Sequence, residues 1–217
     1  MAKIAEKSGT LKILDMGICD YGLVLDKQLE LCGLRQNDSI TDTIILVEHP
    51  PVITLGARQD KNCLLADENE LAKKDIAVVP IRRGGGSTAH NPGQMVFYPI
   101  IHLKQRQLGI NEYIRKLEQI GIELFSRCGI AAERKKGLPG LWVGEKKIAS
   151  IGVKVSRSVT YHGMAININN DLAIFDYIVP CGLDGVEMTS VLKETGCTTP
   201  MEKVKTDLSE ILLEHFA

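Results

Sequence analysis

Three groups of residues in this 217-residue sequence could together carry out covalent acyl transfer. Cys181 stands between Pro180 and Gly182, a loop setting that favours the exposure a nucleophilic thiol needs. Lys147 lies in an expected strand, and a partly desolvated lysine can accept a proton. A thiol, a lysine to take its proton and a glycine-rich loop to hold an acyl group make a covalent acyl-transfer site.

The glycine-rich loop is residues 83–94, Arg-Gly-Gly-Gly-Ser-Thr-Ala-His-Asn-Pro-Gly-Gln, directly after an expected strand. Three successive glycines leave backbone N–H groups uncovered and permit positive φ, so the loop can fold closely round a carbonyl, a carboxylate or a phosphate. Arg83 and His90 add donors at its ends. A bare triple glycine is more often a turn, but the flanking Arg, Thr, His and Gln favour a binding loop. It is neither a Walker A loop nor a dinucleotide fingerprint.

Each of the other segments has an ordinary structural interpretation when it stands alone. Lys147 could be a solvated strand lysine beside Lys146, residues 161–167 a plain strand containing a glycine, and Cys181 a structural loop cysteine. Burying an ammonium is costly, so a lysine on a core face needs a reason. What favours a functional interpretation is that all these segments share one chemical purpose.

Short strands mixed with helices must position these groups. We expect helices at residues 20–34, 67–72, 113–124 and from 200 onward, and strands at 43–48, 52–55, 77–81, 94–101, 141–143, 147–155 and 159–167. Asn111 is the expected N-cap of the third helix, and residues 199–202 (Thr-Pro-Met-Glu) predict a capping box with proline at the first helical position.

The arrangement of these elements indicates the fold class. Strands and helices alternate without a regular βαβ rhythm, so we expect an α+β fold in one domain over residues 1–217, with a mixed, mostly antiparallel sheet flanked by helices. In the strand 147–155, strict alternation would place Lys147, Ala149 and Ile151 on one face, and Ile148 and Ser150 on the other.

Composition and charge exclude several classes of function. A content of 44% hydrophobic and 24% charged residues is that of a globular protein, and a net charge of -1 lacks the basic excess of nucleic-acid binding. No stretch approaches 18 uninterrupted apolar residues, so no membrane span is expected, and residues 1–7 do not resemble a secretory signal. The six cysteines show no C-x-x-C pair and no zinc-ligand spacing. We therefore expect reduced thiols, no metal and a cytoplasmic location.

Five segments, in order, resemble the motifs of the lipoyl(octanoyl) transferase family, and the resemblance runs from about Glu48 to Thr189. They are residues 48–56, the loop 83–94, and residues 147–152, 162–165 and 180–182. The loop departs from the usual family pattern at Gly86, Ala89 and Asn91, where glutamine, an aromatic residue and glycine are more common. Residues 86–88 lean toward the related lipoate ligases.

The resemblance implies a biotin/lipoate protein ligase-like fold and a role for each motif. Cys181 would be the acyl-thioester nucleophile, and Lys147 would make its thiol more acidic and move protons. The residues implied to line the acyl pocket are Arg83, Gly84, Gly85, Gly86, Ser87, Thr88, Ala89, His90, Ser150, Ile151, Gly152, Gly163, Met164 and Ala165.

The activity implied is transfer of octanoyl (or lipoyl) from acyl carrier protein, through a cysteine thioester, to a lipoyl-domain lysine in lipoate biosynthesis. The acceptors would be the E2 subunits of 2-oxoacid dehydrogenases or the glycine-cleavage H protein, with no nucleic-acid or membrane partner. Thioester exchange is nearly balanced in energy, so neither ATP nor a cofactor is expected.

Three alternatives remain open from the sequence. An ATP-dependent lipoate-protein ligase would not need Cys181, a thioesterase would use water as acceptor, and a non-catalytic acyl-binding module would show no turnover. Among single residues, His49 could equally cap a strand end or touch the site, and Trp142 and Phe97 are expected in the core or pocket wall.

Overall fold

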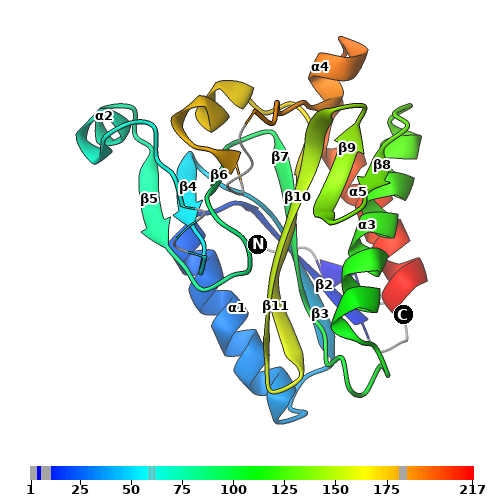
Figure 1. The fold of residues 1–217 in the computed structure, drawn as a ribbon. Helices are drawn as coiled ribbons and strands as arrows, with labels where there is room; N and C mark the ends of the chain where they lie inside the picture. Colours follow the sequence, from blue (N-terminus) through cyan, green and yellow to red (C-terminus); the bar gives the residue numbers. More distant parts are fainter. Residues whose placement is uncertain (1–3, 6–10, 59, 61, 181–184) are drawn as a thin grey trace.

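Two β-sheets form the frame of the chain (Figure 1). The computed structural model describes residues 4–5, 11–58, 60, 62–180 and 185–217. Its strands are β1 (Ile4–Ala5), β2 (Leu11–Ile18), β3 (Asp42–Glu48), β4 (Val52–Leu55), β5 (Ala77–Pro80), β6 (Thr88–His90), β7 (Gln94–Ile100), β8 (Glu133–Lys135), β9 (Leu138–Val143), β10 (Lys146–Ser156) and β11 (Val159–Asn167). Its helices are α1 (Tyr21–Gln36), α2 (Glu68–Lys73), α3 (Ile110–Arg127), α4 (Val191–Thr195) and α5 (Met201–Phe216), with a 3₁₀ helix η2 (Leu172–Tyr177).

The sheets are mixed and mostly antiparallel. The larger has the order β1-β2-β3-β7-β11-β10-β9-β8 and the smaller the order β5-β4-β6. Within the described residues only the pairs β2–β3 and β4–β5 are parallel. The predicted fold class is therefore confirmed.

Helices cover both faces of the larger sheet, with α1 on one face and α3 and α5 on the other (Figure 1). The alternation of β3 explains this arrangement, because Ile45 and Val47 pack in the cluster that includes α1 while Ile44 and Leu46 pack with α3 and α5. A strand covered on both faces needs apolar residues on both sides, and residues 44–47 at the centre of β3 are all apolar.

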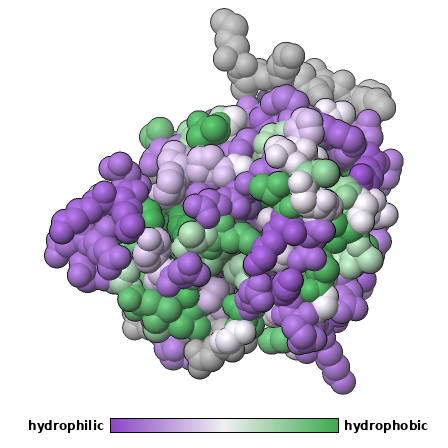
Figure 2. Space-filling model, turned by 90° about the horizontal axis from the view of Figure 1, so that it is seen from above, coloured by the Kyte–Doolittle hydropathy of each residue, from purple (hydrophilic) through white to green (hydrophobic). Residues whose placement is uncertain are grey.

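The predicted strands and long helices are present, with bounds that differ by a few residues, and β4 and β11 have the predicted bounds. The expected exposed helix is α2, which forms the hydrophilic lobe at the left of Figure 2 and buries only Leu71. The sequence patterns do not indicate β2, β6, β8 or α4. Among the described helices, none has the length and apolarity needed to cross a membrane.

Two of the predicted caps are wrong. Gly109, not Asn111, is the N-cap of α3, because the Glu112 carboxylate accepts the Gly109 N–H at 2.8 Å and so begins the helix earlier. At α5 the N-cap is Pro200 and no side chain caps the helix. Thr199 is instead held by Asn169, which accepts the Thr199 N–H at 3.0 Å and donates to its carbonyl at 2.7 Å.

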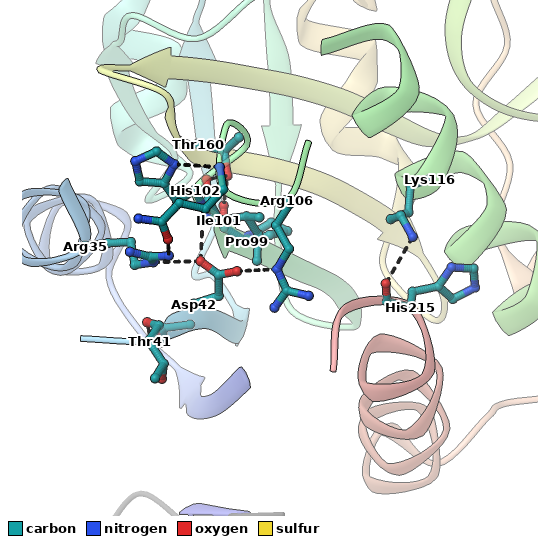
Figure 3. A network of polar contacts seen from close by, with 12 residues as sticks. Arg35, Thr41, Asp42, Pro99, Ile101, His102, Arg106, Lys116, Thr160 and His215 are labelled. Carbon is teal, nitrogen blue, oxygen red and sulfur yellow. Dashed lines mark hydrogen bonds and ion pairs between the residues drawn. The ribbon is translucent and has the colours of Figure 1, made fainter. Parts of the chain in front are cut away.

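A buried carboxylate at the start of β3 joins neighbouring elements of the fold (Figure 3). Asp42, at the start of β3, accepts from Arg35 Nε and Arg106 Nε, each at 2.8 Å, and from the backbone N–H of His102 at 3.0 Å. Arg35 lies in the last turn of α1, whereas His102 and Arg106 follow β7. One charge network therefore fixes how α1 and the β7–α3 connection meet β3.

Replacing Asp42 with asparagine should destabilise the fold by about 3 kcal/mol, because the buried Arg35 guanidinium then loses its countercharge. Urea unfolding followed by circular dichroism measures this change. The control is Asp38→Asn, which touches the same arginine but is mostly exposed and should change little. Equal stability of the Asp42 and Asp38 variants would contradict this account of the network.

Candidate functional site

The glycine-rich loop between β5 and β6 folds against β4 and β10. The N–H groups of Ala57 and Arg58 donate to the carbonyls of Arg83 and Gly85 at 3.0 and 3.4 Å, and the Gly84 N–H donates to Val153 at 3.1 Å. A Cβ on Gly56 would lie 2.2 Å from the Gly85 carbonyl oxygen, so this approach requires glycine at that position. The loop is thus held between the two sheets.

The Arg83 side chain holds the loop in shape. Its Nη1 donates to the carbonyl of Gly86 at 2.8 Å and to that of Gly84 at 3.1 Å. Its Nη2 donates to the Thr54 hydroxyl at 2.8 Å and carbonyl at 3.1 Å. These bonds direct the guanidinium at the loop's own backbone. Arg83 therefore shapes the site and places a positive charge beside it.

Lys147 is only 2% exposed, so the solvated alternative is excluded. Its ammonium lies 5.4 Å from the centre of the Trp142 ring, a distance at which a cation is attracted to the ring face. It lines a cavity of about 380 Å³ together with Gly84, Gly85 and Gly152. A buried lysine therefore faces the glycine-rich loop across a cavity.

The predicted alternation of this strand is wrong at one point. The pairing of β10 with β9 shifts register between Lys147 and Ala149. Ile148 and Ala149 are both fully buried and belong to the same core cluster, instead of facing opposite sides. The irregularity lies beside Lys147, where β-bulges commonly re-aim a side chain.

A second, smaller cavity of about 30 Å³ lies behind the loop. Ile151 and Gly152 line both cavities. The other predicted residues that line the small cavity are Arg83, Thr88, His90, Ser150, Gly163, Met164 and Ala165. The structure thus gathers most of the predicted residues around two adjoining cavities.

Three predicted residues lie elsewhere. The Ser87 hydroxyl donates to the Val179 carbonyl at 2.8 Å, Ala89 is in the core cluster of the small sheet, and buried Gly86 offers its carbonyl to Arg83. Their contribution is to hold the loop, since none of them lines either cavity.

Cys181 lies outside the described residues, as do residues 182–184. The described residues on either side of them are placed beside the site. Val179 receives the Ser87 hydroxyl, whereas the Lys147 N–H donates to the Glu187 carbonyl and the Thr189 N–H donates to the Lys147 carbonyl, each at 2.9 Å.

Sequence reasoning missed Tyr21, Tyr98 and His162, which also line the small cavity. His162 belongs to the motif 162–165, but nothing in the sequence signals the two tyrosines. Tyr98 and His49 are hydrogen-bonded through the hydroxyl and Nε2 at 2.9 Å. His49 therefore lies behind the cavity wall and does not line the cavity itself.

Three histidines of this region are held neutral. Burial lowers the pKa of His49 to about 4, and it lowers the pKa of His90 and of His162 to about 3. For His90 the neighbouring His49 and the positive charge of Arg83 add to the effect, and for His162 Arg83 and Lys154 do so. The rings offer hydrogen-bonding groups without charge.

The comparisons with known proteins agree with one another. A family model described as the lipoyl protein ligase A/B catalytic domain matches residues 20–213. A curated octanoyltransferase of Solibacter usitatus is 46% identical over 202 residues, which is 93% of this chain and 89% of the relative. One from a Roseiflexus strain is 43% identical over 209 residues, covering 95% of this chain and 85% of the relative.

Solved structures show the same fold at low identity. A crystal structure of lipoate-protein ligase A bound with ATP has a TM-score of 0.70 at 15% identity, covering 96% of this chain and 85% of that one. A biotin protein ligase from Aquifex aeolicus has a TM-score of 0.53 at 14% identity, covering 95% of this chain and 68% of that one. The predicted biotin/lipoate protein ligase-like fold is confirmed.

The neutral histidines predict a pH dependence of stability. Their folded pKa values lie below the unfolded value near 6.5, so the unfolded chain binds more protons, and stability falls as the pH drops from about 6.5 towards 4. Each histidine contributes a slope of up to about 1.4 kcal/mol per pH unit. In urea unfolding between about pH 5 and 6, His90→Gln should bind about one proton fewer on unfolding than the wild type. An unchanged slope would contradict the burial of neutral His90.

Proposed function

We propose, from the premise that this chain belongs to the lipoyl protein ligase A/B catalytic domain family, that it moves an octanoyl group from acyl carrier protein through Cys181 to a lipoyl-domain lysine. It is an acyltransferase for octanoyl groups in lipoate biosynthesis, as its similarity to curated octanoyltransferases over most of its length indicates. The activity expected from the sequence is thereby confirmed. What we propose beyond this activity is the identity of the donor and the acceptor and the role of each residue.

One observation carries the assignment of the residue roles. The segment that contains Cys181 is anchored before it, where Val179 receives the Ser87 hydroxyl of the loop, and after it, where Glu187 and Thr189 bond to the backbone of Lys147. Cys181 is two residues from Val179 in sequence. These anchors support a site in which the thiol works beside the loop and the buried Lys147.

The chemistry balances in two steps. The reacting form of Lys147 is the neutral amine, which accepts the thiol proton. The Cys181 thiolate then attacks the carbonyl of the carrier thioester, and the carrier thiolate leaves and takes up that proton from Lys147. The lipoyl-domain lysine, in its neutral form, then attacks the acyl-cysteine. A proton of the attacking lysine passes by way of Lys147 to the departing Cys181 sulfur. The product is an amide between the octanoyl group and the lipoyl-domain lysine. The sequence of events is a ping-pong reaction through a covalent intermediate.

The charge around the mouth of the site supports an anionic donor. Arg58 lines the Lys147 cavity, and Arg82 and Lys154 line an adjoining cleft of about 570 Å³. Among the described residues, no aspartate or glutamate lines either space. A carrier protein presents its thioester on an arm that contains a phosphodiester, so this positive rim would speed its approach.

The second candidate is an ATP-dependent lipoate-protein ligase, because a lipoate-protein ligase A bound with ATP shares this fold. At 15% identity that likeness concerns the fold alone. A ligase would activate a free acid and would transfer it without Cys181. Dependence on ATP with free octanoate as substrate would therefore favour the ligase over the transferase.

We predict that the chain transfers octanoyl from octanoyl-acyl carrier protein to a lipoyl domain without ATP. Lys147→Met should lower the rate about 10²–10⁴-fold, the usual loss when a positioned proton acceptor is removed. A gel-shift or mass assay of the acceptor measures the rate. The matched control is Lys146→Met, because Lys146 is partly exposed and its ammonium lies near Glu194. Equal rates for the two variants would argue against a proton-transfer role for Lys147.

The donor rim gives a separate prediction. Arg82→Glu with Lys154→Glu should raise the KM for octanoyl-acyl carrier protein about 10-fold at low salt, with kcat little changed, and the effect should shrink as salt rises. Lys73→Glu with Lys104→Glu is the matched control, since both lysines are exposed and line neither space. An effect on the lipoyl-domain KM alone would assign the rim to the acceptor and contradict the donor role.

A further inference from the structure

Asn167 lies where β11 ends and the segment 187–189 comes to lie beside β10. It is the last residue of β11 and pairs with Gln94, the first residue of β7. The pairing of β11 with β10 begins at Ala149, two residues after Lys147. At Lys147 the backbone N–H and carbonyl are bonded instead to residues 187 and 189, each at 2.9 Å. The segment 187–189 is therefore the neighbour of β10 at the buried lysine.

The Asn167 side chain ties this segment to the start of β7. Its Nδ2 donates to the Thr189 carbonyl at 2.9 Å, and its Oδ1 accepts from Gln94 Nε2 at 2.9 Å. All three residues are buried, so a polar group that lost its partner here could not bond to water without a rearrangement. Because the Thr189 N–H donates to the Lys147 carbonyl, Asn167 is connected to the backbone of Lys147 through a single residue.

The direction of each hydrogen bond follows from the carbonyls at the two ends. A carbonyl only accepts, so the amide atoms that face the carbonyls of Ala89 and Thr189 must be nitrogens. The Gln94 nitrogen donates to Ala89 at 3.2 Å, and the Gln94 oxygen therefore faces His90 Nδ1 at 2.7 Å. His90 lines the small cavity. One buried chain of hydrogen bonds thus runs from the wall of that cavity to the backbone of Lys147.

We propose that Asn167 is a positioning residue that holds Lys147 in place, acting through the Thr189 carbonyl. This inference rests on the proposed function, because Lys147 is the proton acceptor of that reaction. The other neighbour of Lys147 is β9, and its pairing with β10 shifts register directly after Lys147. The segment 187–189 therefore fixes where Lys147 lies, and Asn167 fixes the segment.

The position of Asn167 requires a side chain that donates on one side and accepts on the other. An amide does both, whereas a carboxylate only accepts and an aliphatic side chain does neither. Without its donor, the buried Thr189 carbonyl must move to find another partner, and the bonded backbone of Lys147 moves with it. A misplacement of about 1 Å at a reacting group can lower a rate about 100-fold.

The test is the rate at which an octanoyl adduct forms on the chain from octanoyl-acyl carrier protein, followed by intact-protein mass spectrometry at several donor concentrations. Asn167→Asp keeps an oxygen for the Gln94 amide but turns an acceptor towards the Thr189 carbonyl. The maximal rate should fall about 10–100-fold. The donor concentration that gives half of this rate should stay within about 3-fold, because Asn167 lines neither cavity.

The matched control is Asn169→Asp. Asn169 makes a similar pair of bonds on another segment, where it donates to the Thr199 carbonyl at 2.7 Å and accepts the Thr199 N–H at 3.0 Å. It lines neither cavity, and Thr199 has no recorded bond to Lys147 in the described part of the chain. The adduct should form on this variant within about 2-fold of the wild-type rate.

A double-mutant cycle separates positioning of Lys147 from a general loss of structure. In the Lys147→Met background, Asn167→Asp should lower the remaining rate by less than about 2-fold, because there is no longer a proton acceptor to position. Circular dichroism gives the folded fraction of each variant, and rates are compared per folded chain. Asn167→Ala removes both bonds without adding a charge and should give the same cycle, which provides a second test if Asn167→Asp folds poorly.

An equal fold loss with and without Lys147 would overturn the positioning role, because Asn167 would then act independently of the lysine. Wild-type rates in the Asn167 variants, or a loss of the same size in Asn169→Asp, would overturn it as well. Failure of the proposed function is distinguishable from these results, because the wild-type chain itself would then form no octanoyl adduct from the carrier protein.

Discussion

The rest of the site depends on the hydrogen bonds that the Arg83 guanidinium makes. It joins the glycine-rich loop to Thr54 of β4 and fixes the carbonyls of Gly84 and Gly86. With the loop held in this way, Gly84 can bond to Val153 of β10, and the Lys147 cavity has a wall. Burial lowers the pKa of His90 and of His162, and the positive charge of Arg83 adds to this effect, so the side chain that shapes the site also helps to keep both rings neutral.

The residues of the site come from both sheets. The small sheet carries the loop, and the large sheet carries Lys147 and the lining of both cavities on β10 and β11. The segment around Cys181 joins them, because its described flanks bond to Ser87 on one side and to Lys147 on the other. A reaction that needs a thiol, a proton acceptor and a bound acyl chain can thereby be assembled from parts far apart in sequence.

Much of the fold could be predicted from the sequence, because apolar periodicity records which faces are buried. The run at residues 43–48 and the stripe at residues 113–124 are examples. Helix caps were predicted less well. Asn111 and Thr199 are residue types that favour an N-cap, but Glu112 instead binds the Gly109 N–H and Asn169 binds the Thr199 N–H. Ile148 was assigned to the wrong face for a similar reason, because the register shift in β10 depends on its pairing with β9 and not on the sequence of β10 alone.

The residues of the site could likewise be predicted only in part. Residue type and order indicated the loop, Lys147 and most of the residues that line the two cavities. They did not indicate Tyr21 or Tyr98, which line the small cavity only because distant segments meet there. Ser87 and Ala89 show the converse, because membership of a motif did not place them at the cavities.

The central claim is that Cys181 carries the acyl group, and intact-protein mass spectrometry tests it most directly. The chain is mixed with octanoyl-acyl carrier protein without ATP, beside Cys181→Ala and the exposed-cysteine control Cys197→Ala. An octanoyl adduct should form on the wild type and on Cys197→Ala but not on Cys181→Ala, and the adduct should be discharged when a lipoyl domain is added. An adduct that persists in Cys181→Ala, or transfer to the lipoyl domain by that variant, would contradict the account.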